Sequence, residues 1–405
     1  MSLDIRPIMS ALLRNRTGAV LVSMQVAIAL AVLVNALYIV VQRIEKIHRV
    51  TGLDEPNIFV IQSGGFTGRF HEVPSIREDL AYMRSLGDVV AATPSNSIPL
   101  SDGGNNDQLV TRPDARRTDH YNMIEVDEQG LDALGMRLVA GRNFRREEIQ
   151  PPLTRTDASR FVPAIIISRA LAEHLFPQGN ALGKQVYDTL NQSATVIGVV
   201  DPIIGNFPTN PHPDWVVFMP RLPDDFIVVE YLVRARPGTR DVLMRTVESH
   251  LAASNPDRVI NFVRPLSYFK NLTYLGDSSM EIYLLTVTGL VLGVTCLGIF
   301  ALATFNVSTR TKQIGTRRAV GARRRDIVRY FLVENALITS TGVLAGCALA
   351  LGAGYWLSLQ YALPRLNLYY LVGGVLSLWA IGQFAAWQPA WRAAAVSPSV
   401  ATRTV

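Results

Sequence analysis

The stretch RTKQIGTRRAVGARRRDIVRY (Arg310–Tyr330) separates two long apolar runs, Ile282–Phe305 and Phe331–Leu359. It contains eight basic residues and a single acidic residue, Asp326. Lys and Arg in short loops beside membrane spans are retained on the cytoplasmic side. We therefore expect this loop to face the cytoplasm and to fix the orientation of the spans on either side of it.

The same loop is expected to be partly helical. Its apolar residues can share one side of a helix and its arginines another. The apolar set is Ile314, Ala319, Val320 and Ala322, and the basic set is Arg317, Arg318 and Arg323. Gly315 and Gly321 would allow another backbone to approach closely.

Composition indicates a membrane protein with one large water-soluble region. Hydrophobic residues make up 49% of the 405 residues, and the mean hydropathy is +0.20, as is typical of a partly embedded chain. Residues 42–281 hold 25 Lys and Arg against 30 Asp and Glu, whereas the remainder holds 14 against 3. The basic excess belongs to the segments beside the spans, so nucleic acid is not an expected partner. Both cysteines, Cys296 and Cys347, fall in apolar runs, which predicts neither a disulfide framework nor a thiolate metal site.

The first apolar run, Gly18–Val41, has 24 residues without a charge. At about 1.5 Å per residue it extends about 36 Å, enough to cross a hydrocarbon core of about 30 Å. A cleaved signal peptide has an apolar core of only about 7–15 residues, so we expect an uncleaved span that enters from the cytoplasm. Gln25 and Asn35 lie within it, where they either form hydrogen bonds between helices or line a transport path.

The charge clusters predict four transmembrane α-helices with both termini in the cytoplasm. A large α+β domain outside the cytoplasm is inserted between the first and second helices. The predicted segments are an N-terminal segment (1–17), span 1 (18–41), the inserted domain (42–281), span 2 (282–305), the basic loop (306–330), span 3 (331–359), span 4 (366–388) and a C-terminal tail (389–405). Small residues in span 3 predict close helix packing; they are Gly342, Ala345, Gly346, Ala348, Ala350, Gly352, Ala353 and Gly354.

The inserted region alternates strand-like and helical patterns. The predicted strands are Asn57–Gln62, Ala164–Ser168, Ala194–Val200, Trp215–Met219 and Phe226–Ala235. The predicted helices are Ser75–Ser85, Ala170–Leu175 and Arg240–Ala253. Boundaries near Glu125 and Pro220 would divide the region into two subdomains, with the inner one at about 126–220.

The sequence contains no recognisable motif for catalysis or cofactor binding. The segment GNALGKQ (Gly179–Gln185) is one residue short of a phosphate-binding loop and has Gln185 in place of the metal-binding hydroxyl, so we interpret it as a loop before a strand. The six histidines are scattered, which is not typical of a zinc enzyme. The acidic pairs Glu147–Glu148 and Asp224–Asp225 are expected to be solvated rather than an acid–base pair. We predict no enzyme active site, cofactor site or metal site in this chain.

The basic stretch and its continuation, RTKQIGTRRAVGARRRDIVRYFLVENAL, resemble the signature of FtsX/MacB-type ABC transporter permeases. That signature places an Arg before Glu-Ile-Gly, then a basic pair, Ala, an aliphatic residue, Gly-Ala and a later Phe-Leu-x-Glu. Three further stretches resemble the MacB-type extracytoplasmic domain, and a fourth resembles the family's C-terminal tail. They are Leu131–Phe144, Ile165–Val186, Ala194–Pro202 and Pro389–Ala401.

The resemblance implies a dimeric permease in the bacterial inner membrane, with its large domain in the periplasm. It also implies that ATP and Mg²⁺ bind to two copies of a partner ABC ATPase on a separate chain. The loop between spans 2 and 3 would be the coupling helix that docks on this ATPase. The implied contact set is Gln313, Ile314, Gly315, Arg317, Arg318, Ala319, Gly321 and Ala322. Alternatively, the basic residues contact lipid head groups, above all Arg323–Arg325.

One departure from the family pattern lies at Gln313, where the signature usually has Glu. The missing charge either weakens an ion pair with the ATPase or indicates a heterodimer whose second permease keeps the Glu. The resemblance does not decide between a homodimer and a heterodimer.

The function implied is that of a MacB-like exporter subunit, which uses ATP-driven motion of its periplasmic domain (mechanotransmission) to export a periplasmic substrate. A membrane-fusion adaptor and an outer-membrane channel would be further partners. One alternative is a lipoprotein-releasing permease. Another is a membrane sensor or scaffold with a ligand-binding outer domain and no transport. The sequence does not identify the substrate.

Overall fold

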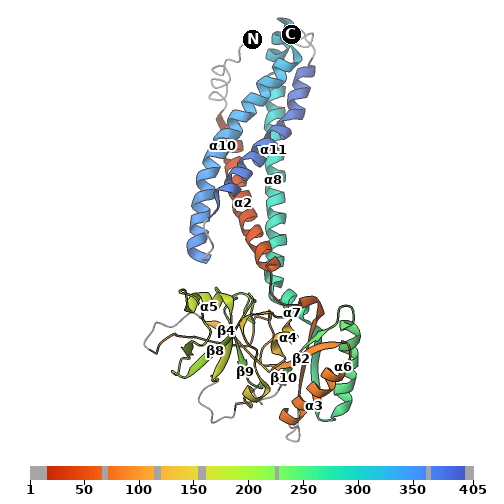
Figure 1. Ribbon diagram of the computed structural model, residues 1–405. Coiled ribbons are helices and arrows are strands. Elements are labelled where there is room, and N and C mark those ends of the chain that lie inside the picture. Colours follow the sequence, from red (N-terminus) through yellow and green to blue (C-terminus); the bar gives the residue numbers. More distant parts are fainter. Residues whose placement is uncertain are drawn as a thin grey trace. The chain divides into compact units, whose positions relative to one another are not determined.

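The computed structural model describes residues 16–65, 72–113, 120–153, 161–223, 228–361 and 366–396 (Figure 1). The chain forms two compact units. One contains residues 1–48 and 276–405, and the other contains Arg49–Leu275. Residues 362–365, between predicted spans 3 and 4, and the ends of both terminal segments lie outside the described residues.

Four helices in the first unit are long and apolar enough to cross a membrane. They are α2 (Arg16–His48), α8 (Leu275–Thr309), α10 (Arg324–Tyr361) and α11 (Leu368–Ala395). The predicted number and order of spans are thus confirmed. Each helix reaches beyond its apolar run at one end or both. At one such extension, Lys46 Nζ of α2 lies 3.2 Å from Asp277 Oδ2 of α8, and Arg43 pairs with the same carboxylate.

Helix α10 packs closely on α2 through two glycines one turn apart, Gly342 and Gly346. A Cβ added at Gly342 would lie 2.6 Å from the Ser23 carbonyl oxygen, and one at Gly346 would lie 2.9 Å from the Leu30 Cβ. Small residues at this spacing allow helix backbones to approach in lipid. Gly352 would meet nothing within 4 Å, so only part of the predicted small-residue set mediates packing.

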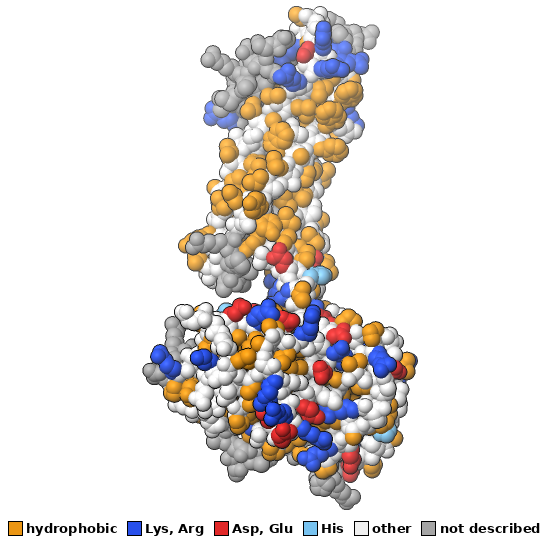
Figure 2. All heavy atoms as spheres, in the orientation of Figure 1, with side chains coloured by type: hydrophobic (Ala, Val, Ile, Leu, Met, Phe, Trp, Pro, Cys, Tyr) orange, Lys and Arg blue, Asp and Glu red, His pale blue; other side chains and the backbone are white. Residues whose placement is uncertain are grey.

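The two amides of the first span form hydrogen bonds between helices. Gln25 Nε2 donates to the Val294 carbonyl of α8 at 2.8 Å, and Asn35 Nδ2 donates to the Ala350 carbonyl of α10 at 3.1 Å. These contacts support the helix-packing interpretation of both residues. Figure 2 shows apolar side chains along the outside of this unit and Lys and Arg side chains gathered at one end of it.

The second unit begins with a four-stranded antiparallel sheet of order β11-β1-β10-β2. Its strands are β1 (Ile58–Gly65), β2 (Val89–Ser95), β10 (Val228–Ala235) and β11 (Arg258–Pro265). Helices α3 (Glu72–Ser85) and α6 (Arg240–Ser254) pack on one face. Strand β1 is buried on both sides, because Phe59 and Ile61 contact this helical layer while Ile58 and Val60 belong to a second core.

The second core is shared with a seven-stranded mixed sheet, in which the order β3-β4-β9-β6-β8-β5 is extended by β7 pairing with β8. Its strands are β3 (Asn105–Asp107), β4 (Tyr121–Val126), β5 (Leu138–Gly141), β6 (Ala164–Ser168), β7 (Gln185–Tyr187), β8 (Ser193–Val200) and β9 (Val216–Pro220). Short helices connect these elements: η1 (Glu55–Asn57), α4 (Gly130–Leu134), η2 (Arg146–Glu148), α5 (Arg169–Leu175) and α7 (Leu266–Thr273).

The five predicted strands and three predicted helices are confirmed to within a few residues, except that the predicted start of the last strand at Phe226 lies outside the described residues. Gly179–Gln185 is a turn that leads into β7. The predicted inner subdomain, about 126–220, begins too late. The second sheet already includes β3, and Glu125 lies fully buried inside β4 rather than at a boundary. The polar residues Asn122 and Glu125 interrupt the apolar pattern of β4, so this strand was not predicted from the sequence. Burial of the Asn122 side chain is tolerated because its Nδ2 donates a hydrogen bond to the Trp215 carbonyl at 3.0 Å.

Candidate functional site

The basic stretch folds as a short helix, α9 (Thr311–Ala319), followed by a tight turn into α10. The predicted helix in the loop is therefore confirmed. The turn depends on Gly321, whose φ of +102° is unfavourable for residues with a side chain. The Gly321 amide donates to the Arg318 carbonyl at 3.1 Å and the Ala322 amide to the Arg317 carbonyl at 3.0 Å. This pair of bonds closes the helix end as a Schellman motif.

The single acidic residue of the stretch starts the next helix. Asp326 Oδ2 accepts a hydrogen bond from the Arg323 amide at 3.0 Å. A carboxylate three residues into a helix satisfies one of the free amides at its start and interacts favourably with the helix dipole. The basic stretch is thus two helices joined by a well-defined turn.

The inner side of α9 is fixed to α10 and α11 by apolar contacts. Ile314 is only 4% exposed, and Gly315 is also buried. The cluster around Ile314 comprises Ile327, Val328 and Phe331 of α10 and Ala390, Ala393 and Ala394 of α11. Burial of an Ile side chain contributes about 1.5–3 kcal/mol, so this cluster holds α9 against both helices.

An ion pair adds a second attachment at the start of α9. Arg310 Nη1 lies 3.0 Å from Glu334 Oε2 of α10 and 3.3 Å from the Tyr330 hydroxyl. The Glu334 side chain is 3% exposed and that of Arg310 is 17% exposed. A charge-assisted bond this well shielded from water is stronger than a surface ion pair, because water screens it less.

The outer side of α9 is basic and open. The Arg317 guanidinium carbon lies 4.8 Å from the centre of the Tyr330 ring, a cation–π distance. Val320, at the turn, is 84% exposed. A shallow depression on this side is lined by Thr316, Arg317, Val320, Gly321, Ala322, Arg323 and Asp326.

The structure divides the predicted contact set into three groups. Those exposed are Gln313, Arg317, Ala319 and Gly321; those half-buried are Arg318 and Ala322; those buried are Ile314 and Gly315. The predicted apolar side is confirmed for Ile314 and for Ala322, which packs against the same cluster, and is wrong for Ala319 and Val320, which are exposed where Gly321 reverses the chain. Arg318 is engaged within the chain, since its Nη1 donates to the Val396 carbonyl at the end of α11.

Three residues of this arrangement were not predicted as site residues: Arg310, Tyr330 and Glu334. Predicted span 3 begins at residue 331, which places Glu334 near its end, but α10 begins at Arg324, so Glu334 lies in its third turn. The sequence signal that could have identified Glu334 is a carboxylate at the edge of an apolar run, because an ionisable residue inside a membrane helix needs a partner.

Two family models match the chain. The MacB-like periplasmic core domain matches residues 18–249, and the FtsX-like permease C-terminal domain matches residues 285–398. The first match covers more than half of the sequence, and the order of the two agrees with the helices and inserted α+β domain described above. The chain belongs to the family of ABC transporter permeases that combine a MacB-like periplasmic core domain with an FtsX-like membrane domain.

Individual relatives are similar over different lengths. The macrolide export ATP-binding/permease protein MacB of Azoarcus sp. (strain BH72) is 25% identical over 355 residues, which are 85% of this chain and 51% of that protein. The MacB of Bradyrhizobium diazoefficiens is 41% identical over 109 residues, 26% of this chain and 16% of that protein. The chain spans about half the length of the curated relatives that it matches over most of its own sequence. The crystal structure of the periplasmic region of MacB from Actinobacillus actinomycetemcomitans aligns with a TM-score of 0.36 and 15% identity, covering 56% of this chain and 97% of that one.

Proposed function

We propose that this chain is the permease of a MacB-like transporter in which the outer side of α9 docks on an ABC ATPase. ATP and Mg²⁺ would bind to that ATPase, and its closing would move α9. The observation that carries this proposal is the division of α9 into a buried inner side and an exposed basic outer side. An exposed helix held on a rigid support is suited to receive a force from a partner.

The contacts of α9 suggest how the motion is passed on. Ile314 packs on both α10 and α11, and Arg310 is paired with Glu334 of α10. A push on α9 would therefore displace these two helices rather than deform a loose loop. Tightly packed helices move as bodies because their interiors resist compression.

The orientation of the proposed permease follows from its charges. The basic turn and both termini would lie in the cytoplasm of a bacterial cell, in accordance with the bias of Lys and Arg toward that side. The inserted domain, with its excess of acidic residues, would lie in the periplasm. There it would act on a periplasmic substrate for export.

Further partners belong to the same proposal. A second permease, either a copy of this chain or a related one, would complete the membrane part. A membrane-fusion adaptor and an outer-membrane channel would receive the exported substrate. Membrane lipid would contact the remaining basic residues, such as Arg324 and Arg325, at the start of α10.

The proposal is tested by reconstituting the full chain with its ABC ATPase in nanodiscs and measuring stimulated ATP hydrolysis. Arg317→Glu reverses a charge on the outer side of α9, and Arg325→Glu makes the same change at the exposed start of α10. Loss of one favourable charge pair at an interface lowers affinity about tenfold or more. We expect Arg317→Glu to weaken ATPase binding by that factor and Arg325→Glu to leave it within about twofold. Equal binding and equal hydrolysis by wild type and Arg317→Glu would show that this surface is not the docking site.

A further inference from the structure

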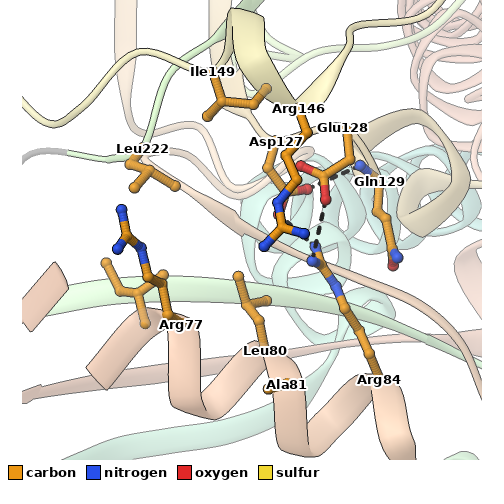
Figure 3. Close-up of a pocket in the computed structure, with 11 residues that line it drawn as sticks. Arg77, Leu80, Ala81, Arg84, Asp127, Glu128, Gln129, Arg146, Ile149 and Leu222 are labelled. Atoms are coloured by element: carbon orange, nitrogen blue, oxygen red, sulfur yellow. Dashed lines mark hydrogen bonds and ion pairs between the residues drawn. The ribbon is translucent and has the colours of Figure 1, made fainter. Parts of the chain in front are cut away.

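A cleft of about 620 Å³ lies between the two layers of the inserted domain (Figure 3). One wall is α3, which packs on the four-stranded sheet. The opposite wall comes from the seven-stranded sheet: the residues just after β4, the helix η2 and the segment after β9. The residues that line it are Ile76, Arg77, Leu80, Ala81, Arg84, Asp127, Glu128, Gln129, Arg146, Ile149 and Leu222. Its volume is in the range of sites that bind small organic ligands.

Arg84 already has acidic partners across the cleft. Its Nη1 lies 3.5 Å from Glu128 Oε1, and its Nη2 contacts the buried Asp127 carboxylate and the Ala92 carbonyl. The Gln129 backbone N–H also donates a hydrogen bond to Asp127 Oδ1 at 3.0 Å. Both carboxylates of the cleft are therefore directed at Arg84, the one cation they can neutralise at close range.

The other two cations that line the cleft are Arg77 and Arg146. Both are exposed, and neither side chain has an acidic partner among the residues that the structure describes. Figure 3 shows Arg77 rising from α3 toward Leu222 and Arg146 extending from the other wall toward α3. Two guanidinium groups thus enter the cleft from opposite walls, and neither forms an ion pair with a carboxylate that the structure describes. The planar fork of an Arg side chain is matched by a carboxylate or a phosphate.

Apart from Gln129, the remaining side chains that line the cleft are apolar. Leu80 and Ile76 of α3 are buried at the base, with Ala81 beside them and Ile149 and Leu222 on the facing wall. An aliphatic chain in contact with these side chains would be removed from water, which contributes about 0.8 kcal/mol per CH₂ group. The cleft therefore presents cations and an apolar surface to the same ligand.

We propose that this cleft binds a small amphipathic anion, with its carboxylate or phosphate held between Arg77 and Arg146 and its aliphatic part against Leu80, Ile149 and Leu222. A ligand in this position touches both layers of the inserted domain. The proposal is independent of the docking of α9, because its residues and its test involve neither the ATPase nor ATP.

The test is calorimetric titration of the full chain in nanodiscs, with empty nanodiscs subtracted. The probes are octanoate and dihexanoylphosphatidylglycerol, and octylammonium is the probe of opposite charge. Preference for octanoate would identify a fatty-acid-like ligand, and preference for the short-chain lipid would identify an anionic lipid head group. The variants are R77Q/R146Q and, as the matched control, R245Q, which changes an exposed arginine on α6.

We expect the anionic probes to bind and R77Q/R146Q to lower their affinity about tenfold or more, since one lost charge-assisted contact amounts to about that factor. R245Q should remain within about twofold of wild type. Equal thermal stability of the double variant and wild type would attribute the loss to the site rather than to unfolding. Equal affinity in wild type and R77Q/R146Q, or equal binding of octylammonium, would overturn the proposal.

Two acidic residues close to Leu222 in the sequence allow a second test. Asp224 and Asp225 follow Leu222 closely in the chain, and carboxylates of the protein itself could compete for Arg77. If octanoate binds only to the variant D224N/D225N, the arginines pair with carboxylates of the protein itself, and the proposal fails. Binding to wild type that D224N/D225N leaves unchanged supports it.

Discussion

Arg310 Nη1 lies 3.0 Å from Glu334 Oε2 and so joins the start of α9 to the third turn of α10. The same guanidinium contacts Tyr330, whose ring in turn lies beneath Arg317. The exposed cation of the outer side is thus connected, through one aromatic ring, to the shielded ion pair. This arrangement fixes the orientation of α9 on the helices that it is proposed to move.

Removing Arg310 should destabilise the membrane unit, because it leaves the shielded Glu334 carboxylate without its counter-charge. We expect R310A to lower the free energy of unfolding by about 3 kcal/mol, the lower end of the range for breaking a buried pair. E334Q should have a smaller effect, since its amide is neutral and can still accept a hydrogen bond. SDS-induced unfolding of the full chain, followed by circular dichroism, measures both.

The control for this prediction is R325A, which removes an exposed arginine of α10 and should change stability by less than about 0.5 kcal/mol. In the double variant R310A/E334Q the two losses should be less than additive. Strict additivity would mean that the two side chains do not interact.

Close packing of α2 on α10 predicts different responses from two glycines of the same helix. G342L places a side chain where the Ser23 carbonyl and Val26 already lie, and overpacking of this kind costs about 1–3 kcal/mol. G352L has open space around it and should be neutral. Thermal unfolding of the two variants in the same detergent gives the comparison, and equal stability would refute the packing.

The Arg142–Glu148 pair of the inserted domain predicts a dependence on pH. The hydrogen bond from Arg142 lowers the pKa of Glu148 below its ordinary value of 4.5, and a hydrogen bond from the Arg145 amide acts in the same direction. The pair therefore contributes stability above about pH 4.5, and this contribution is lost as the pH falls through the lowered pKa. Both side chains are partly exposed, so the effect is small. E148Q should lower the melting temperature of the full chain at pH 7, and its difference from wild type should narrow as the pH is lowered below about 4.5; a constant difference would contradict this.

Gln313 is exposed on α9, at the position where the family signature described above has Glu. If that position faces a cation on the ATPase, Q313E should raise the affinity for the ATPase by about two- to fivefold, as a rim charge pair contributes less than about 1 kcal/mol. Affinity would be measured at low and high salt. An increase that salt abolishes supports an ion pair, whereas weaker binding by Q313E would show that this ATPase prefers the amide.

The fold was largely predictable from the sequence because its signals are long and repetitive. An uncharged run such as Gly18–Val41 can hardly be other than a span, and β-branched runs such as Ala164–Ser168 are typical of buried strands. Several of the strands that were missed contain polar residues. In β4, Asn122 and Glu125 interrupt the apolar pattern, and the burial of Asn122 depends on hydrogen bonds to the carbonyls of Pro213 and Trp215, which are remote in sequence.

The candidate site was predictable in position but not in detail. The basic composition of Arg310–Tyr330 and the glycine at 321 indicate a helix followed by a turn. Which residues face inward depends on the partners that α10 and α11 provide, and those contacts are remote in sequence. Arg318 illustrates the limit, since its carbonyl partner at Val396 lies 78 residues away.

The central claim, that the outer side of α9 docks on an ABC ATPase, is tested most directly by site-specific photo-crosslinking. Benzoylphenylalanine at Val320, which is 84% exposed, should crosslink the full chain to its co-expressed ATPase in membranes. The same label at Val242, 58% exposed on α6 of the inserted domain, is the control and should give no such product. A crosslink from position 320 and none from 242 is the predicted result. Co-purification of the ATPase with the Val320-labelled chain, without any crosslink from that position, would contradict the account.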